Sequence, residues 1–216
     1  SATHVKLDAT DDQKKKAKKE VQEKTLQDML TMNLVLWKAK SGINDADDWT
    51  KAAAYFFGSG GASDSEHTVY NRAQKRCKDY GTCMNTGEAK VNALIAQALN
   101  SKSDKAASYA NIVKQFKVLY SQNVLRYANL IDQKIGAPED LIEIIGEGQA
   151  FWRILKPWLT DNEARKVFDR MFSTVYTPQA ANNYNYCIAK KYIDALLTST
   201  MGTAGAAATA LGNLDE

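Results

Sequence analysis

The sequence is poor in residues that interrupt or cross-link a chain, with three prolines, three cysteines and two histidines among 216 residues. Sustained alternation of polar and apolar residues is missing, which argues against a β-sheet. No apolar run approaches the roughly 18 residues of a membrane-spanning helix, so we expect no membrane span. Walker, GxGxxG, GxSxG, HExxH and CxxC motifs are absent, so we expect no enzyme. The net charge of +3 does not indicate nucleic acid binding.

Apolar residues instead recur at helical spacing along most of the chain, between residues typical of helix ends. The predicted helices run from about Asp11 to Lys38, from Asp45 to Gly58, from about Ser65 to Lys78, from Thr86 to Leu99, from Ser103 to about Lys134, from Pro138 to before Pro157, from Thr160 to about Ser173 and from Thr177 through Leu197. We predict an all-α fold, an antiparallel bundle of about seven to eight helices with a Gly-rich loop and a short disulfide-closed turn. One helical domain would cover residues 1–216, with a long basic N-terminal helix in 1–40 and a flexible Ala/Gly-rich tail in 200–216.

The first predicted helix carries a run of lysines, at positions 14, 15, 16, 18 and 19. Acidic residues flank this run, so it is either a solvated helix face or a surface for an anionic partner. Farther along the same helix, the apolar residues Leu34, Val35, Leu36 and Trp37 are expected to be buried on all sides.

The three cysteines allow one disulfide and one free thiol. Cys77 and Cys83 are close in sequence, and a turn at Gly81 can bring their sulfur atoms together, so we predict this pair. Cys187 pairing with either of them, or three free thiols, are the alternatives. A disulfide would indicate an oxidising, extracellular or periplasm-like compartment.

The Gly-rich loop before Tyr70 contains Asp64, Glu66 and His67. Oxygen and imidazole donors of this kind suit ferric iron or another hard cation, so the loop is one candidate metal site. In the alternative interpretation, Asp64 or Ser65 caps the following helix and Glu66 lies in its first turn.

A second candidate metal site lies on the helix that begins at Pro138. Glu139, Glu143 and Glu147 are spaced four residues apart and share one helix face, which is also typical of an outward-facing acidic stripe. Gly146 and Gly148 flank Glu147, and two glycines inside a helix suggest that something approaches the backbone closely. Glu147 needs a partner among its apolar neighbours: a metal ion, or Arg126 or Arg153 in a buried structural pair.

The long helix that ends near Lys134 supplies further candidates. Tyr120 and Tyr127 share one face, where either packing or metal ligation by the phenol oxygen would suit them. Arg126 could hold a synergistic anion or orient Glu147, so we expect Arg126, Arg153 and Tyr120 to lie behind the ligands, where they would hold an anion or position the ligand side chains.

Several segments together carry a family resemblance. They are Trp49–x4–Ala54–Tyr55–x2–Gly58, Tyr70–Asn71–x–Ala73–x–Lys75–Arg76, Tyr80–Gly81–Thr82, Val91–Asn92, Tyr120–x–Gln122–x2–Leu125–Arg126–Tyr127–Ala128 and Glu147–Gly148–x–Ala150–Phe151–Trp152–Arg153. In this order they resemble the low-iron-inducible periplasmic protein family of algae, over about Asp47 to Trp158. No single segment is diagnostic, and the loop before Tyr70 is variable in such proteins.

The resemblance implies a secreted, non-enzymatic protein of the periplasm or cell surface that binds iron for uptake. Ferric iron would be the ligand, and a cell-surface partner or a second copy of the chain is a further expectation. The ligand residues proposed above come from chemistry and position, because the resemblance transfers none. The alternative function is a helical structural or interaction module of the cell surface with no metal ligand.

Overall fold

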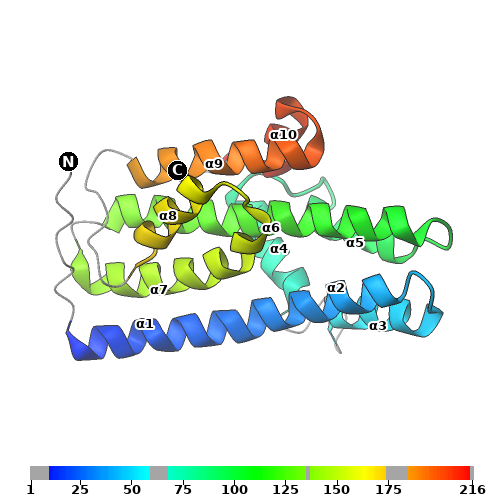
Figure 1. Ribbon diagram of the computed structural model, residues 1–216, viewed down its shortest axis with the longest axis horizontal. Helices are drawn as coiled ribbons and strands as arrows, with labels where there is room; N and C mark the ends of the chain where they lie inside the picture. Colours follow the sequence, from blue (N-terminus) through cyan, green and yellow to red (C-terminus); the bar gives the residue numbers. More distant parts are fainter. Residues whose placement is uncertain (1–9, 59–67, 135–136, 174–183, 215–216) are drawn as a thin grey trace. The chain divides into compact units, whose positions relative to one another are not determined.

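The computed structural model describes residues 10–58, 68–134, 137–173 and 184–214 of the chain (Figure 1). The described residues are helical, without a β-strand, which confirms the predicted all-α bundle. The elements are α1 (Asp11–Lys24), the π-helical segment η1 (Thr25–Leu30), α2 (Thr31–Ser41), α3 (Ala46–Phe57), α4 (Val69–Asp79), α5 (Lys90–Leu99), α6 (Lys105–Lys134), α7 (Pro138–Leu155), the 3-10 segment η3 (Lys156–Trp158), α8 (Asn162–Met171), α9 (Tyr184–Met201) and α10 (Ala204–Leu211). No helix within these ranges is both long and apolar enough to cross a membrane.

The chain divides into two compact units, which are described separately. The first unit comprises the residues up to Thr25 and Tyr120–Ser199, and the second comprises Leu26–Leu119 and the residues from Thr200 onward. Each unit is therefore built from two separate stretches of sequence. Whether the two units act as the single domain expected for residues 1–216 stays a prediction.

The first unit is organised by the packing of α1 against α7 (Figure 1). Ala17 and Ile142 form part of their buried contact. A side chain added at Gly146 would meet the Ala17 carbonyl oxygen at 2.8 Å, so the glycine allows the close approach that the sequence suggested. Gly148 likewise has no room for a side chain, because the Phe172 ring lies against it. The two glycines of α7 therefore serve packing.

The second unit begins with α2 and α3, which form an antiparallel pair across a short turn. Asp45 caps α3, as the sequence predicted, by accepting the Asp47 and Asp48 amides. The Trp49 indole donates to the Leu99 carbonyl at 2.6 Å and so ties α3 to the end of α5. Such a buried donor needs a partner, and this bond supplies it.

The long N-terminal helix continues to Ser41 and contains a π-helical segment that the sequence did not indicate. The expectation that Trp37 is buried is wrong: it is 62% exposed, and Leu26 and Leu30 are exposed with it. Met32, Val35 and Ala39 occupy the buried face of α2. Trp37 lies two residues after Val35, which on a helix is nearly the opposite face.

Two helix starts differ from those expected. Thr68 caps α4, and its hydroxyl accepts the Asn71 amide at 3.2 Å. Asp161 caps α8 in place of Thr160, because its carboxylate accepts the Glu163 amide at 2.8 Å. Both threonine and aspartate cap helices, and aspartate is the better cap, which agrees with Asp161 taking the position beside Thr160.

Two more starts are displaced in the second unit. Asp104 replaces Ser103 as the cap of α6, and its carboxylate accepts the Ala107 amide at 3.0 Å. Thr86, the expected cap of α5, instead accepts the Glu88 amide within a turn, and α5 has no side-chain cap. The isolated β-bridge between Cys83 and Ala89 keeps this segment extended and delays the helix.

The C-terminal region contains a helix where the sequence suggested a flexible tail over residues 200–216. Thr203 caps α10 by accepting the Ala206 amide at 3.1 Å. Ala207 and Leu211 are buried, which anchors α10 within the second unit. The composition alone did not indicate these contacts, because alanine and glycine carry little apolar patterning.

Candidate functional site

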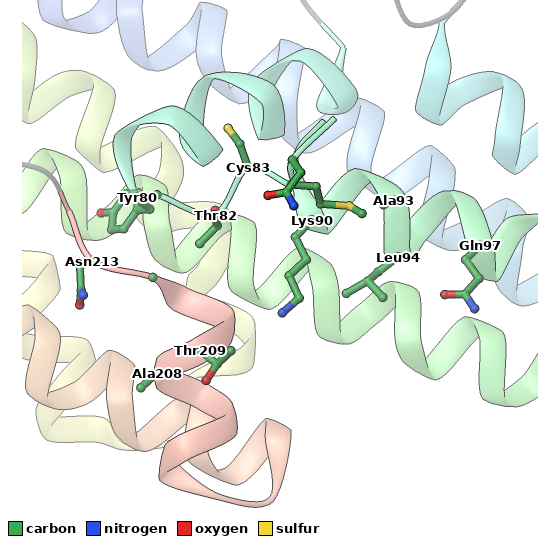
Figure 2. A pocket seen from close by; sticks show the side chains of 14 residues that line it. Tyr80, Thr82, Cys83, Lys90, Ala93, Leu94, Gln97, Ala208, Thr209 and Asn213 are labelled. Carbon is green, nitrogen blue, oxygen red and sulfur yellow. The ribbon is translucent and has the colours of Figure 1, made fainter. Parts of the chain in front are cut away.

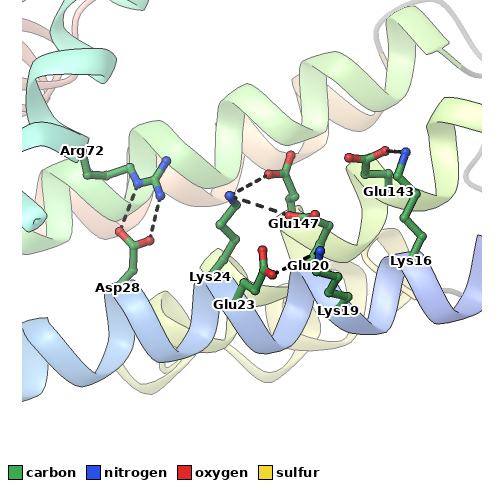
Figure 3. Close-up of polar contacts among 9 residues, drawn as sticks. All are labelled: Lys16, Lys19, Glu20, Glu23, Lys24, Asp28, Arg72, Glu143 and Glu147. Carbon is green, nitrogen blue, oxygen red and sulfur yellow. Dashed lines mark hydrogen bonds and ion pairs between the residues drawn. The ribbon is translucent and has the colours of Figure 1, made fainter. Parts of the chain in front are cut away.

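Two acidic residues of α7, Glu143 and Glu147, face lysines of α1 within the first unit (Figure 3). The Lys16 ammonium pairs with the Glu143 carboxylate. Lys24 lies 3.5 Å from Glu147 and 3.7 Å from Glu20 of its own helix. We call these five residues the α1–α7 seam. An outward-facing acidic stripe is therefore the wrong interpretation for Glu143, and lysines of the N-terminal run have their anionic partners within the chain.

The seam places three carboxylates beside two ammonium groups: Lys24 is close to Glu20 and Glu147, and Lys16 pairs with Glu143. Burial raises the pKa of Glu20, and the neighbouring carboxylates Glu147, Glu23 and Glu143 raise it further, while Lys24 opposes them. The hydrogen bond with Glu143 raises the pKa of Lys16. The pKa shift of Glu20 thus comes first from burial, and that of Lys16 comes from its partner Glu143.

The partner of Glu147 differs from the expected arginines, since its ion pair is with Lys24. Arg153 is exposed and lines a small cavity of about 440 Å³ beside Lys14 and Lys18. The Arg126 guanidinium lies 5.5 Å from the Tyr127 ring. A buried Glu147–Arg153 pair is thus the wrong expectation, because Arg153 projects to the surface.

The two tyrosines of the candidate site are buried in aromatic packing. Tyr127 stacks on Phe151 with ring centroids 5.4 Å apart, and Tyr120 lies 6.5 Å from the same ring. As predicted from their spacing, Tyr120 and Tyr127 lie on the same face of α6. This geometry is that of a packed core, with Phe151 of α7 as the common neighbour.

The loop residues Asp64, Glu66 and His67 lie outside the described residues. Over the ranges that the structure describes, no three His, Cys, Asp or Glu side chains are grouped to hold a metal ion. In the seam, the partner of Glu143 is Lys16 and the partner of Glu147 is Lys24.

The predicted disulfide is present in the second unit. Cys77 and Cys83 are bonded, with their Cα atoms 4.8 Å apart, and Cys187 is an exposed free thiol. The Thr82 amide donates to the Cys77 carbonyl at 2.9 Å inside this short ring. Gly81 has a φ of 61°, a conformation that side chains disfavour, so glycine suits the turn.

A buried polar network holds the loop that follows the disulfide. The Asn92 side chain donates to the Tyr70 carbonyl at 2.9 Å and to the Gln74 side-chain oxygen at 3.1 Å. Gln74 in turn donates to the Gly87 carbonyl at 3.1 Å and accepts the Ala89 amide. The Tyr70 hydroxyl donates to Glu88. The loop is thus fixed to both α4 and α5.

The end of α10 closes over the disulfide turn. The Asn213 amide donates to the Tyr80 carbonyl at 3.1 Å. Gly212 has a φ of 74°, and a side chain there would collide with the Tyr80 carbonyl and the Thr82 methyl group. Only glycine allows the chain to pass so close to the turn.

Between this loop, α5 and α10 lies an open groove of about 870 Å³ (Figure 2). Met84, Leu94 and Ala208 supply apolar lining, and Thr82, Gln97 and Thr209 supply polar groups. Lys90 projects into the groove from the start of α5. A second cavity of about 340 Å³ shares Lys90, Leu94 and Thr209 and extends the groove along α10. Concave, mostly apolar sites of this size are typical of small-molecule binding.

Sequence reasoning missed the groove and the residues that shape it. The only sequence signal for these residues was that Tyr70, Asn92 and Tyr80 lie in the segments that carry the family resemblance. No sequence signal pointed to Gln74, Lys90 or Gly212, because their roles arise from contacts with residues distant in sequence.

Comparison with protein-family models, with curated proteins and with solved structures returns no match to this chain.

Proposed function

We propose that this chain is a non-enzymatic binding protein that holds a small amphipathic molecule in the groove between α5, α10 and the disulfide turn. The observation that carries the proposal is the groove itself, about 870 Å³ in volume and lined by apolar side chains with a few polar groups. A drug-sized ligand fits this volume.

The construction of the groove wall supports the proposal. One wall is closed covalently by the Cys77–Cys83 bond and held by the Gln74–Asn92 hydrogen bond. The opposite wall is tied to it where Asn213 meets Tyr80. A site formed before its ligand arrives binds more tightly, because less conformational entropy is lost on binding.

We place the protein in an oxidising compartment, secreted to the periplasm or the cell surface. The disulfide supports this placement, because such bonds persist outside reducing cytosols. A small carrier or sensor of the cell surface is the role that combines this location with an open groove.

Fluorescence of the neutral dye N-phenyl-1-naphthylamine tests the proposal, because its emission rises in apolar sites. Thr209→Trp would fill the groove, and we expect it to weaken dye binding at least about tenfold. Thr50→Trp is the matched control, since both threonines are exposed on helices and both hydroxyls donate to the carbonyl four residues earlier. Equal binding by the wild type and Thr209→Trp, or no binding by the wild type, contradicts the proposal.

Binding of a hard cation such as ferric iron is the second candidate function, as the sequence resemblance implies. The observation that favours it is that the Glu20 and Glu147 carboxylates share one ammonium group, that of Lys24, at 3.7 Å and 3.5 Å. Burial, and then the nearby carboxylates, raise the pKa of Glu20. A multivalent cation could replace the Lys24 ammonium among these carboxylates, since oxygen ligands suit hard cations.

Calorimetric titration with ferric citrate tests this second candidate. Glu147→Ala should abolish stoichiometric binding, whereas Glu163→Ala, an exposed carboxylate of α8, should leave it unchanged. Binding that persists in Glu147→Ala removes the seam as the site and leaves Asp64, Glu66 and His67 to be tested in the same way. Elemental analysis of protein purified without chelators gives an independent measurement.

A further inference from the structure

Lys90 is the one charged residue among the described residues that line the groove. Its ammonium group points into the space between α5 and α10 (Figure 2). Over the described part of the chain, no carboxylate forms an ion pair with it. The nearby acid Glu88 accepts a hydrogen bond from the Tyr70 hydroxyl instead. The groove thus presents a single available positive charge.

The charge of Lys90, an exposed side chain, does not favour α5. Lys90 is the first residue of that helix, where the helix dipole disfavours a cation, and α5 lacks a side-chain cap. A serine or aspartate nearby would stabilise the helix better. The lysine is therefore better explained by what it offers to the groove.

Lys90 also lies where the two cavities meet. It lines both the larger cavity and the 340 Å³ extension, whose other wall contains Met201, Ala206 and Ala210 of the α9–α10 region. Leu94 is common to both cavities and supplies apolar surface on the α5 side. An elongated ligand can place a charged end at Lys90 and an apolar body along α10.

We propose that the groove binds an organic carboxylate with an aliphatic body, whose carboxylate accepts a hydrogen bond from the Lys90 ammonium. This inference rests on the proposed function, because it assigns the ligand class of the same groove. The charged hydrogen bond selects the anion, and the apolar walls supply affinity that does not depend on its charge.

Competition against bound N-phenyl-1-naphthylamine tests the ligand class. Dodecanoate is the probe, below its critical micelle concentration, and 1-dodecanol is its neutral counterpart of equal chain length. Wild-type protein should prefer dodecanoate by roughly tenfold, the contribution of one charge-assisted hydrogen bond in a partly exposed site. Lys90→Gln should bind both compounds equally, and Lys90→Arg should keep the preference.

Lys40→Gln is the matched control, because Lys40 is an exposed lysine of α2 away from the groove-lining residues. It should behave as the wild type. Equal displacement by dodecanoate and dodecanol in the wild type, no displacement by dodecanoate, or an unchanged preference in Lys90→Gln overturns the carboxylate assignment. Those results leave dye binding and its loss in Thr209→Trp intact, so failure of the inference is distinct from failure of the proposed function.

Discussion

Single glycines set how closely segments of this protein approach one another. Gly146 admits the Ala17 backbone in the first unit, and Gly212 admits the Tyr80 carbonyl in the second. Gly212 adds a conformational requirement, with a φ of 74°. Gly202 shares the positive φ, at 88°, but a Cβ atom added there would meet nothing within 4 Å. Comparing Gly202 with Gly212 therefore distinguishes the effect of backbone strain, which both share, from that of steric collision, which only Gly212 has.

Gly212→Ala is expected to destabilise the protein by roughly 2–4 kcal/mol, combining left-handed strain with displacement of α10 from the disulfide turn. Gly202→Ala should lose only about 1 kcal/mol from backbone strain. Urea denaturation gives both free energies of unfolding. Equal losses would mean that the contact between Gly212 and Tyr80 contributes nothing.

The Asp48 carboxylate makes the stability of the second unit depend on pH in the acid range. Hydrogen bonds from Lys38 and Ser41 lower the pKa of its carboxyl to about 2, from 3.8. The contribution is therefore complete above pH 3.8 and is lost as the pH falls toward 2. Asp48→Asn should be less stable than wild type at neutral pH, and the difference should shrink across that window in pH-dependent thermal melts. Asp47→Asn, at an exposed neighbour, is the control.

The disulfide-closed turn links α4, which contains Cys77, to Cys83, which lines the groove. Closing so short a ring restricts the unfolded chain and stabilises by about 2 kcal/mol in the loop-entropy description. The Cys77→Ser/Cys83→Ser variant should lose about that free energy of unfolding and should also weaken dye binding. Cys187→Ser, which removes the exposed thiol, should change neither quantity. Unchanged dye binding in the double variant would show that the groove wall does not need the bond.

The α1–α7 seam depends on Lys24, which serves two carboxylates. Lys24→Gln leaves Glu20 and Glu147 facing each other and should destabilise by roughly 1 kcal/mol at pH 7. Because the pKa of Glu20 is already raised by burial and by Glu147, lowering the pH toward 4.5 protonates it and should narrow the deficit. Lys15→Gln, at an exposed pair with Asp12, should have little effect. A deficit that grows on acidification contradicts this account.

Sequence periodicity predicted where the helices lie in the chain well, but it predicted poorly which helix faces are buried and which side chains meet. Both boundaries of α3 and the end of α6 follow from local signals, namely Asp45, Gly58 and the run of apolar positions up to Lys134. Which face of a helix is covered depends on neighbours distant in sequence, so the exposure of Trp37 was missed. The same limit hid the pairing of Glu147 with Lys24, because spacing places both residues on helix faces without saying which faces meet.

At the scale of the whole molecule, the two units are interleaved along the chain. The second unit needs residues from Thr200 onward, because α10 supplies buried residues and one wall of the groove. A chain ending at Ser199 should therefore show faster amide hydrogen exchange in α4 and α5. Amides of α8 in the first unit provide the internal reference and should be little affected. Equal acceleration in both units would contradict this division.

The interleaving has a consequence for synthesis. Helix α1 leaves the ribosome long before α7, the helix against which it packs, and about 110 residues are translated between them, which takes roughly 6–22 s at ordinary elongation rates. During that interval a helix with an apolar face such as Ala17 and Val21 has no covering partner. We expect the lysines of α1 to keep this segment hydrated until α7 is made, so that Lys16 and Lys24, which later pair with α7, would also limit aggregation of the unfinished chain.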